Sequence, residues 1–264
     1  PSGIGKTALL RELLAEVEHG SRALVLKATC HPRESLLFKA VDGLIDDLVR
    51  HLARDLPERV TAILPPDSDL LARLFPVLGR LREPATQVLL DPYEIRQRAF
   101  AAFGELLRRV ARRQRVILWI DDLQWSDADS AALLRAIFAP EVAPSVFLLV
   151  SHRDASHRDR PPTELAEILA ALRAAALGPG GHGEPTRITL APLTLEQGAE
   201  VAQRFLGAAQ LEVCREIARE GAGDPLLTQE LARFMSGSGA AVAPPITLSK
   251  LLAAQAAALS ATAR

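Results

Sequence analysis

The first seven residues could bind phosphate. They read Pro1, Ser2, Gly3, Ile4, Gly5, Lys6 and Thr7, which is the later part of the motif G-x-x-x-x-G-K-[ST] with its opening glycine falling before Pro1. Glycines in this pattern let backbone N–H groups curve around phosphate oxygens. Lys6 would place a positive charge on the β- and γ-phosphates, and Thr7 would offer its hydroxyl to Mg²⁺. The pattern predicts a P-loop.

An acidic pair follows an apolar segment in the middle of the chain. Residues 116–120 read V-I-L-W-I, and Asp121 and Asp122 come next. A buried strand would hold these carboxylates rigidly, so we expect Asp121 to organise Mg²⁺ and Asp122 to polarise the attacking water. An ordinary strand ending in a turn is the alternative, because Asp is common in turns. The P-loop motif upstream favours the site.

A basic residue follows a second apolar segment. Residues 146–150 read V-F-L-L-V and are followed by S-H-R-D, which includes Arg153. A polar side chain at the carboxyl end of the neighbouring strand can reach the γ-phosphate. The alternative is a surface arginine like Arg158 and Arg160 nearby. We favour the phosphate-sensing interpretation of Arg153.

Composition narrows the classes of partner. The chain has 264 residues and a net charge of −1, from 31 basic and 32 acidic residues, so no global charge attracts nucleic acid or an anionic membrane. The arginine-rich residues 108–115 suit a solvated helix end better than a nucleic-acid patch. No apolar run is long enough to span a bilayer, which predicts a cytoplasmic protein. The two cysteines and six histidines lack metal-ligand spacing, so the expected metal is nucleotide-bound Mg²⁺ alone.

The elements that would position these residues alternate along the chain. Apolar runs predict strands at residues 23–28, 116–120, 146–150 and 187–190, and helical periodicity fills the intervals, with a proline-rich insertion at 56–92. Ser126 with Asp129, and Thr194 with Gln197, have the spacing of capping boxes. The pattern predicts an α/β, three-layer P-loop NTPase with a parallel sheet (residues 1–191), followed by a small helical lid (residues 192–264).

Several motifs together resemble one family. They are GIGKT, VILWIDDLQWSD, LLVSHRD, LAPLTLEQ, GDPLL at residues 223–227, and TLSKLLAAQAAALS. Over nearly its whole length the chain resembles the AAA-type modules of signal-transduction ATPases with numerous domains (STAND). Residues 30–46 are similar to the modules fused behind bacterial serine/threonine protein kinases, which have relatives in transcriptional regulators and adenylate cyclases.

The resemblance implies roles for particular residues. ATP would be the nucleotide, with Lys6 and Thr7 on its phosphates and Mg²⁺. Asp121 would bind the metal, Asp122 would act as base and Arg153 as sensor, and Pro225 would lie near the nucleotide. An effector domain in the same polypeptide (a kinase, a cyclase or a DNA-binding domain), a downstream helical-repeat sensor region and a nucleotide-dependent oligomer are the partners to expect. Neither direct nucleic-acid binding nor membrane binding is expected.

Two departures from the family pattern are visible. Relatives often carry an arginine where this chain has Gln255 in the last helix, and the strand that precedes the P-loop is missing together with its glycine. In folds of this class that strand lies between the strands predicted here at 146–150 and 187–190. We therefore expect the chain as written to be a fragment that aggregates or binds ATP weakly. Restoring roughly ten upstream residues should raise both the solubility of the chain and its affinity for ATP.

The function to expect is an ATP-driven regulatory switch that hydrolyses slowly. One rival is a scaffold that keeps nucleotide without hydrolysing it, and ATP turnover distinguishes the two. Another is a replication-initiator-like AAA ATPase acting on DNA, which salt-dependent DNA binding would support. The balanced charge of the chain argues against DNA.

Overall fold

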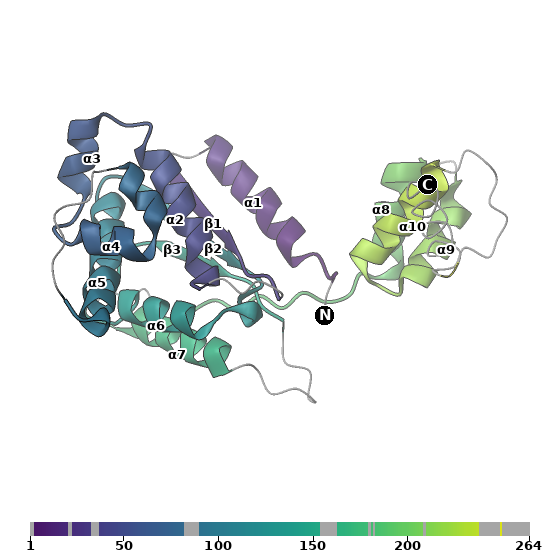
Figure 1. The fold of residues 1–264 in the computed structure, drawn as a ribbon. Helices are drawn as coiled ribbons and strands as arrows, with labels where there is room; N and C mark the ends of the chain where they lie inside the picture. Colours follow the sequence, from purple (N-terminus) through teal and green to yellow (C-terminus); the bar gives the residue numbers. More distant parts are fainter. Residues whose placement is uncertain are drawn as a thin grey trace, which may run out of the picture. The chain divides into compact units, whose positions relative to one another are not determined.

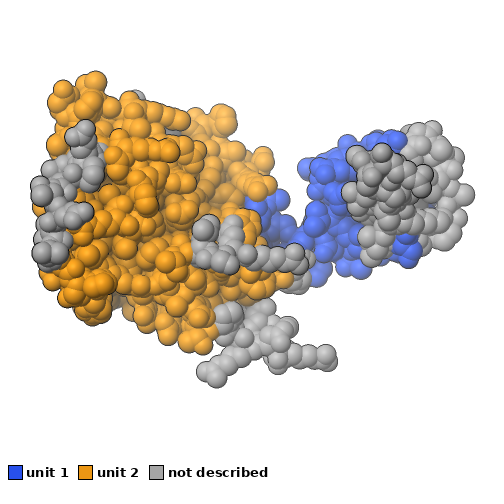
Figure 2. All heavy atoms as spheres, viewed as in Figure 1, with its two compact units in different colours: residues 1–9, 188–264 blue, residues 10–187 orange. Residues whose placement is uncertain are grey.

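The computed structural model describes residues 3–20, 23–32, 37–81, 90–153, 163–178, 181, 183–207, 210–237 and 249. Pro1, Ser2, Arg158, Arg160 and Gln255 lie outside these ranges, as does most of the helix predicted at the end of the chain. The chain forms two compact units, residues 10–187 (the larger unit) and residues 1–9 with 188–264 (the smaller unit), coloured orange and blue in Figure 2. The predicted boundary between ATPase core and lid, at residue 192, stays a prediction.

A parallel sheet forms the centre of the larger unit. Its strands are β1 (Ala23–Thr29), β2 (Arg115–Asp121) and β3 (Phe147–Val150), in the order β1-β2-β3. The register pairs Thr29 with Asp121 and Ile120 with Val150. The three strands therefore end at one edge of the sheet, and the residues that follow β2 and β3 lie close together. The strands predicted at 23–28, 116–120 and 146–150 are confirmed.

Helices cover both faces of this sheet. In Figure 1, α2 (Lys39–Leu52) lies on one side of the strands and α6 (Ala128–Ile137) with α7 (Thr163–Leu177) on the other, which makes the three-layer arrangement predicted from the sequence. The apolar stripe of α2 is fully buried at Leu44, Ile45 and Leu48. The remaining helical elements are α1 (Lys6–Gly20), α3 (Pro57–Ile63), α4 (Ser68–Leu74), the short helix η1 (Pro76–Arg80), α5 (Pro92–Ala111) and the short helix η2 (Leu123–Trp125).

Asp127 caps two helices at once. Its carboxylate accepts hydrogen bonds from the backbone N–H groups of Phe38 and Lys39 at the start of α2, both at 3.0 Å, and from the backbone and hydroxyl of Ser130 in α6. Burial raises the pKa of Asp127, but these hydrogen bonds outweigh it and the net pKa lies below its ordinary value. The capping box predicted for Ser126 and Asp129 is wrong. The residue that caps α6 is Asp127, one position after Ser126, and it has the extended backbone of a cap.

His51 makes the stability of the larger unit sensitive to pH. Burial and then the charge of Arg54 lower its pKa below the ordinary value of 6.5, while Asp55 acts in the opposite direction. The amide nitrogen of Gln114 lies 2.8 Å from Nε2 of the ring and donates to it, which suits a neutral imidazole. Acidification below pH 6.5 therefore protonates the unfolded chain before the folded one, and the free energy of unfolding falls.

We expect the substitution His51→Gln to reduce this pH dependence. Urea unfolding at pH 7 and pH 5 should show a larger loss of stability in the wild type than in the variant, since the other histidines are common to both. The effect should be confined to the range between pH 6.5 and the lowered pKa of the folded state. Identical losses in the two proteins would contradict this role of His51.

The smaller unit contains three described helices, α8 (Leu195–Leu206), α9 (Leu211–Gly221) and α10 (Pro225–Gly237). They pack around Ala202, Cys214, Ile217 and Leu231, all completely buried. The capping box predicted at Thr194 and Gln197 is confirmed, with both reciprocal hydrogen bonds formed. These helices form a packed group in the part of the chain where the small helical lid was predicted, and its role as a lid stays a prediction.

The strand predicted at residues 187–190 is wrong. These residues form no strand, and Ile188 is 76% exposed. An extended segment becomes a strand only when a neighbour supplies its hydrogen bonds, and among the described residues β3 pairs with β2 alone. Phe147 of β3 is 61% exposed. The expected strand before the P-loop stays a prediction.

Candidate active site

The P-loop belongs to the smaller unit and has the backbone that its glycines predict. Gly3 and Gly5 have φ angles of 83° and 94°, a region that side chains other than glycine rarely adopt. Helix α1 begins at Lys6, directly after this turn, so the first N–H groups of the helix follow the loop. Loops that bind phosphate at a helix N-terminus have such a turn, and phosphate binding by this loop stays a prediction.

The start of α10 packs against the P-loop. A Cβ atom added to Gly3 would lie 2.6 Å from Oδ2 of Asp224, and one added to Gly5 would lie 3.9 Å from Cγ of Pro225. Asp224 is held in place because Oδ1 accepts hydrogen bonds from the backbone N–H groups of Leu226 (2.9 Å) and Leu227 (3.1 Å). The structure thus brings Pro225 beside the P-loop, 220 positions later in the sequence.

The acidic pair belongs to the larger unit and is held by Ser151. Asp121 is the last residue of β2 and is 2% exposed. Ser151, directly after β3, donates its hydroxyl to Oδ1 of Asp121 and accepts a hydrogen bond from the backbone N–H of Asp122 at 3.0 Å. Asp122 has a left-handed backbone with φ of 53°, which is uncommon for a residue other than glycine. Such backbone conformations are concentrated at functional sites.

Gln124 links Asp122 to Arg153. Its amide nitrogen donates to Oδ1 of Asp122 at 3.0 Å, and its amide oxygen accepts from the backbone N–H of Arg153, also at 3.0 Å. The guanidinium carbon of Arg153 lies 5.7 Å from the centre of the Trp125 ring, within the range of a cation–π contact. The structure therefore brings together Asp121, Asp122 and Arg153, which the sequence placed on two separate strands.

Comparison with known proteins places the chain in a family. Residues 1–150 match the family model of the AAA ATPase domain, which is more than half of the 264 residues. The chain belongs to the AAA ATPase domain family. Domains of this family are nucleotide-binding ATPase modules. The narrower resemblance to STAND modules stays a prediction.

Two further comparisons add little to the assignment of the chain to the AAA ATPase domain family. A solved structure of a RuvB point mutant from Thermotoga maritima is similar at 14% identity and a TM-score of 0.36, covering 96% of this chain and 68% of that one. A similarity at this level supports no argument about function. No curated protein sequence matches the chain.

The sequence motifs of the AAA ATPase domain did not identify Ser151 and Gln124. Ser151 is the first residue after β3, and Gln124 lies two positions after Asp122. The only signal in the sequence was position, because polar residues that follow neighbouring parallel strands meet at the same edge of a sheet. Their hydrogen bonds become visible only once the order and register of β2 and β3 are known.

The donors present in this AAA ATPase domain fit Mg²⁺. A buried carboxylate (Asp121) and a hydroxyl (Thr7) are hard oxygen ligands, and Mg²⁺ is usually bound by one or two such carboxylates together with substrate phosphates. Thr7 lies in the smaller unit and Asp121 in the larger one. Within the described ranges no group of three or more His, Cys, Asp or Glu residues could hold a metal ion without further ligands.

No described helix is long and apolar enough to cross a membrane.

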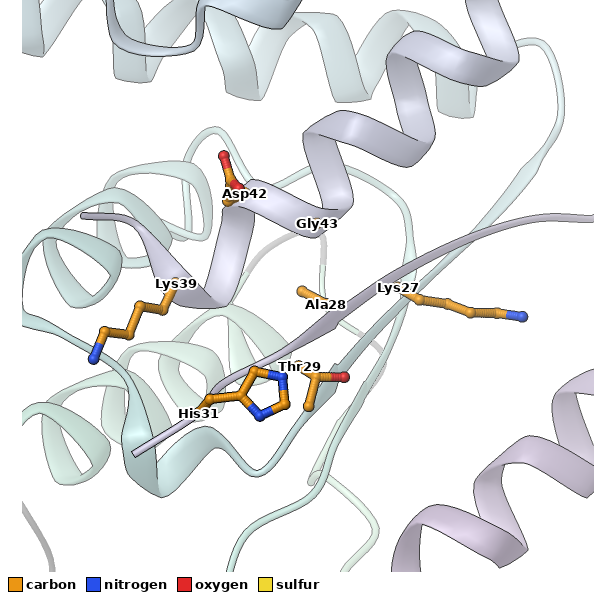
Figure 3. A pocket seen from close by; sticks show the side chains of 7 residues that line it. All are labelled: Lys27, Ala28, Thr29, His31, Lys39, Asp42 and Gly43. Atoms are coloured by element: carbon orange, nitrogen blue, oxygen red, sulfur yellow. The ribbon is translucent and has the colours of Figure 1, made fainter. Parts of the chain in front are cut away.

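A cavity of about 270 Å³ lies at the carboxyl end of β1 in the larger unit (Figure 3). Ligand pockets usually measure about 300–1,000 Å³, so this one is small for a nucleotide. Figure 3 shows Lys27 and Lys39 extending in different directions, and Lys27 is paired with Glu18 at 2.8 Å. The cavity is lined by Lys27, Ala28, Thr29, His31, Lys39, Asp42 and Gly43.

Proposed function

We propose that the chain is an ATP-binding and slowly hydrolysing switch in a multidomain bacterial signalling protein. The observation that carries this proposal is the packing of Gly3 and Gly5 against Asp224 and Pro225 at the start of α10. A phosphate bound by the P-loop would touch the same backbone that the helices of the smaller unit touch. ATP and ADP can then favour different arrangements of α10, and a ligand shifts an equilibrium by its differential affinity for the two states.

Each residue of the proposed site has a separate task. The P-loop backbone from Pro1 to Gly5 would surround the phosphates, and Lys6 would neutralise their charge. Thr7 and Asp121 would hold Mg²⁺, which would supply positive charge to the phosphates. Asp122 would orient the attacking water and accept its proton, and Arg153 would sense the γ-phosphate. The left-handed turn at Asp122, and the hydrogen bonds that Ser151 donates to Asp121 and accepts from Asp122, support this division of labour between two adjacent carboxylates.

The wider setting is part of the same proposal. The effector would be a protein kinase, a cyclase or a DNA-binding domain in the same polypeptide, with a helical-repeat sensor region downstream and a nucleotide-dependent oligomer as one output. The protein would act in the cytoplasm.

Hydrogen–deuterium exchange tests the switch directly. We expect residues 221–228 to exchange at different rates in Mg-ATP and Mg-ADP, because the turn before α10 contacts the P-loop. The variant Lys6→Ala should remove the difference. Equal exchange in ATP and ADP, with both nucleotides bound, would contradict a switch and favour a scaffold that keeps nucleotide for structure alone.

A further inference from the structure

We propose that Gln124 is a positioning residue for ATP hydrolysis, which couples the carboxylate of Asp122 to the backbone of Arg153. This inference rests on the proposed function, because it assigns Asp122 and Arg153 to the reaction. It adds a residue that lies outside the P-loop and the acidic pair.

The chemistry of a primary amide suits this link. Glutamine is a neutral side chain that can donate to a carboxylate with its nitrogen and accept from a backbone N–H with its oxygen. Gln124 does both, with two hydrogen bonds of 3.0 Å. It is 8% exposed, so water has little access to replace either bond, and an unmade bond at this position is costly.

The first bond fixes the orientation of Asp122. Gln124 occupies Oδ1, and the backbone N–H of Asp122 is held by the hydroxyl of Ser151. Backbone and side chain of Asp122 are therefore each restrained by a different partner. Oδ2 is then the oxygen that would accept a hydrogen bond from the attacking water. A general base must lie within about 2.6–3.2 Å of the group that it deprotonates, so its orientation decides its efficiency.

The second bond ties the same amide to the sensor strand. Arg153 follows β3, and its backbone N–H donates to Gln124 while its guanidinium lies over the ring of Trp125. Trp125 is the neighbour of Gln124 in the short helix η2. A shift of Arg153 towards a γ-phosphate would therefore move the backbone to which Gln124 is bonded, and the amide would transmit the shift to Asp122.

The test compares phosphate release from Mg-ATP by the full chain and its variants. Gln124→Met has a similar shape but makes neither bond, and Gln124→Glu keeps the acceptor for Arg153 while losing the donor to Asp122. Both should lower kcat by about 10- to 100-fold, since a misplacement of about 1 Å at a catalytic group costs up to about 100-fold. KM for Mg-ATP should change less than about threefold, because nucleotide binding uses other residues.

Gln114→Met is the matched control. Gln114 is a partly buried glutamine whose amide nitrogen likewise makes a hydrogen bond, in its case to His51. It lies at the other end of the sheet, before β2, and its replacement should leave kcat unchanged.

The possible outcomes separate this inference from the proposed function. A wild type that hydrolyses ATP, with Gln124 variants of equal kcat, would overturn the positioning role and leave the proposed function intact. The same holds if the variants change KM alone. A wild type that releases no phosphate would overturn both.

A spectroscopic measurement tests the inference even if the Gln124 variants fail to fold, because it leaves Gln124 in place. The NMR signals of the side-chain amide of Gln124 should differ between the wild type and the variant Asp122→Asn. Unchanged signals would show that the amide does not contact Asp122, and would overturn the inference.

Discussion

Replacing Lys6 by alanine should lower the affinity for Mg-ATP by about 10- to 100-fold without unfolding the chain. Lys6 is the first residue of α1 and follows Gly5, whose φ of 94° lets the loop turn into the helix. A hydrogen bond to a charged group contributes about 1.5–3 kcal/mol, which corresponds to this range of affinity. Isothermal titration calorimetry measures the change, and the thermal melt should remain cooperative.

Lys39→Ala is the matched control for this prediction. Lys39 is also the first residue of a helix, α2, and it lines the cavity at the end of β1. It should leave the affinity unchanged if ATP binds at the P-loop. Weaker binding in Lys39→Ala together with unchanged binding in Lys6→Ala would place the nucleotide in that cavity instead.

The substitution Asp122→Asn should keep Mg-ATP bound and slow hydrolysis by about 100- to 10,000-fold, the usual contribution of a general base. Asparagine has the shape of aspartate, and its amide oxygen can still accept the hydrogen bond from Gln124. The variant therefore removes the basic oxygen while preserving the surroundings. Phosphate release and calorimetric affinity should be measured on the same preparation.

Asp121→Asn should behave differently from Asp122→Asn. Asp121 is buried and bonded to Ser151, and its proposed task is to bind the metal, so its loss should raise the Mg²⁺ concentration needed for half-maximal ATP affinity. Equal turnover in wild type and Asp122→Asn would refute the assignment of the base. Equal Mg²⁺ dependence in wild type and Asp121→Asn would refute that of the metal ligand.

The strands were predictable because a covered parallel strand is a short run of apolar residues. The predicted segments 23–28, 116–120 and 146–150 agree with β1, β2 and β3 to within one residue at each end. Residues 187–190 have a similar apolar pattern but form no strand. A strand also requires a partner, and the sequence of a segment does not say whether its partner is present.

Local chemistry was also insufficient at the start of α6. Ser126 and Asp129 have the spacing of a capping box, yet Asp127 is the cap. The reason is tertiary, because Asp127 also accepts hydrogen bonds from Phe38 and Lys39 at the start of α2, 89 and 88 positions earlier in the chain. That contact depends on how α2 and α6 pack, which helical periodicity does not reveal.

The candidate site also contains residues that the sequence predicted and residues that only the structure reveals. Motifs predicted Lys6, Asp121, Asp122 and Arg153 as site residues, because their proposed chemistry depends on residue type and spacing. Gln124 depends on geometry, since its two partners follow different strands. The contact of Asp224 with Gly3 likewise joins residues from opposite ends of the chain and was not predicted.

A crystal structure of the chain with Mg²⁺ and a non-hydrolysable ATP analogue tests the central claim most directly. We expect the phosphates to lie on the backbone N–H groups of residues 3–7, with Lys6 on the β- and γ-phosphates. Thr7 and Asp121 should be the protein ligands of Mg²⁺, and Pro225 should lie beside the nucleotide. An analogue bound in the cavity lined by Lys27 and His31, or a P-loop that leaves the phosphates uncontacted, would contradict the account.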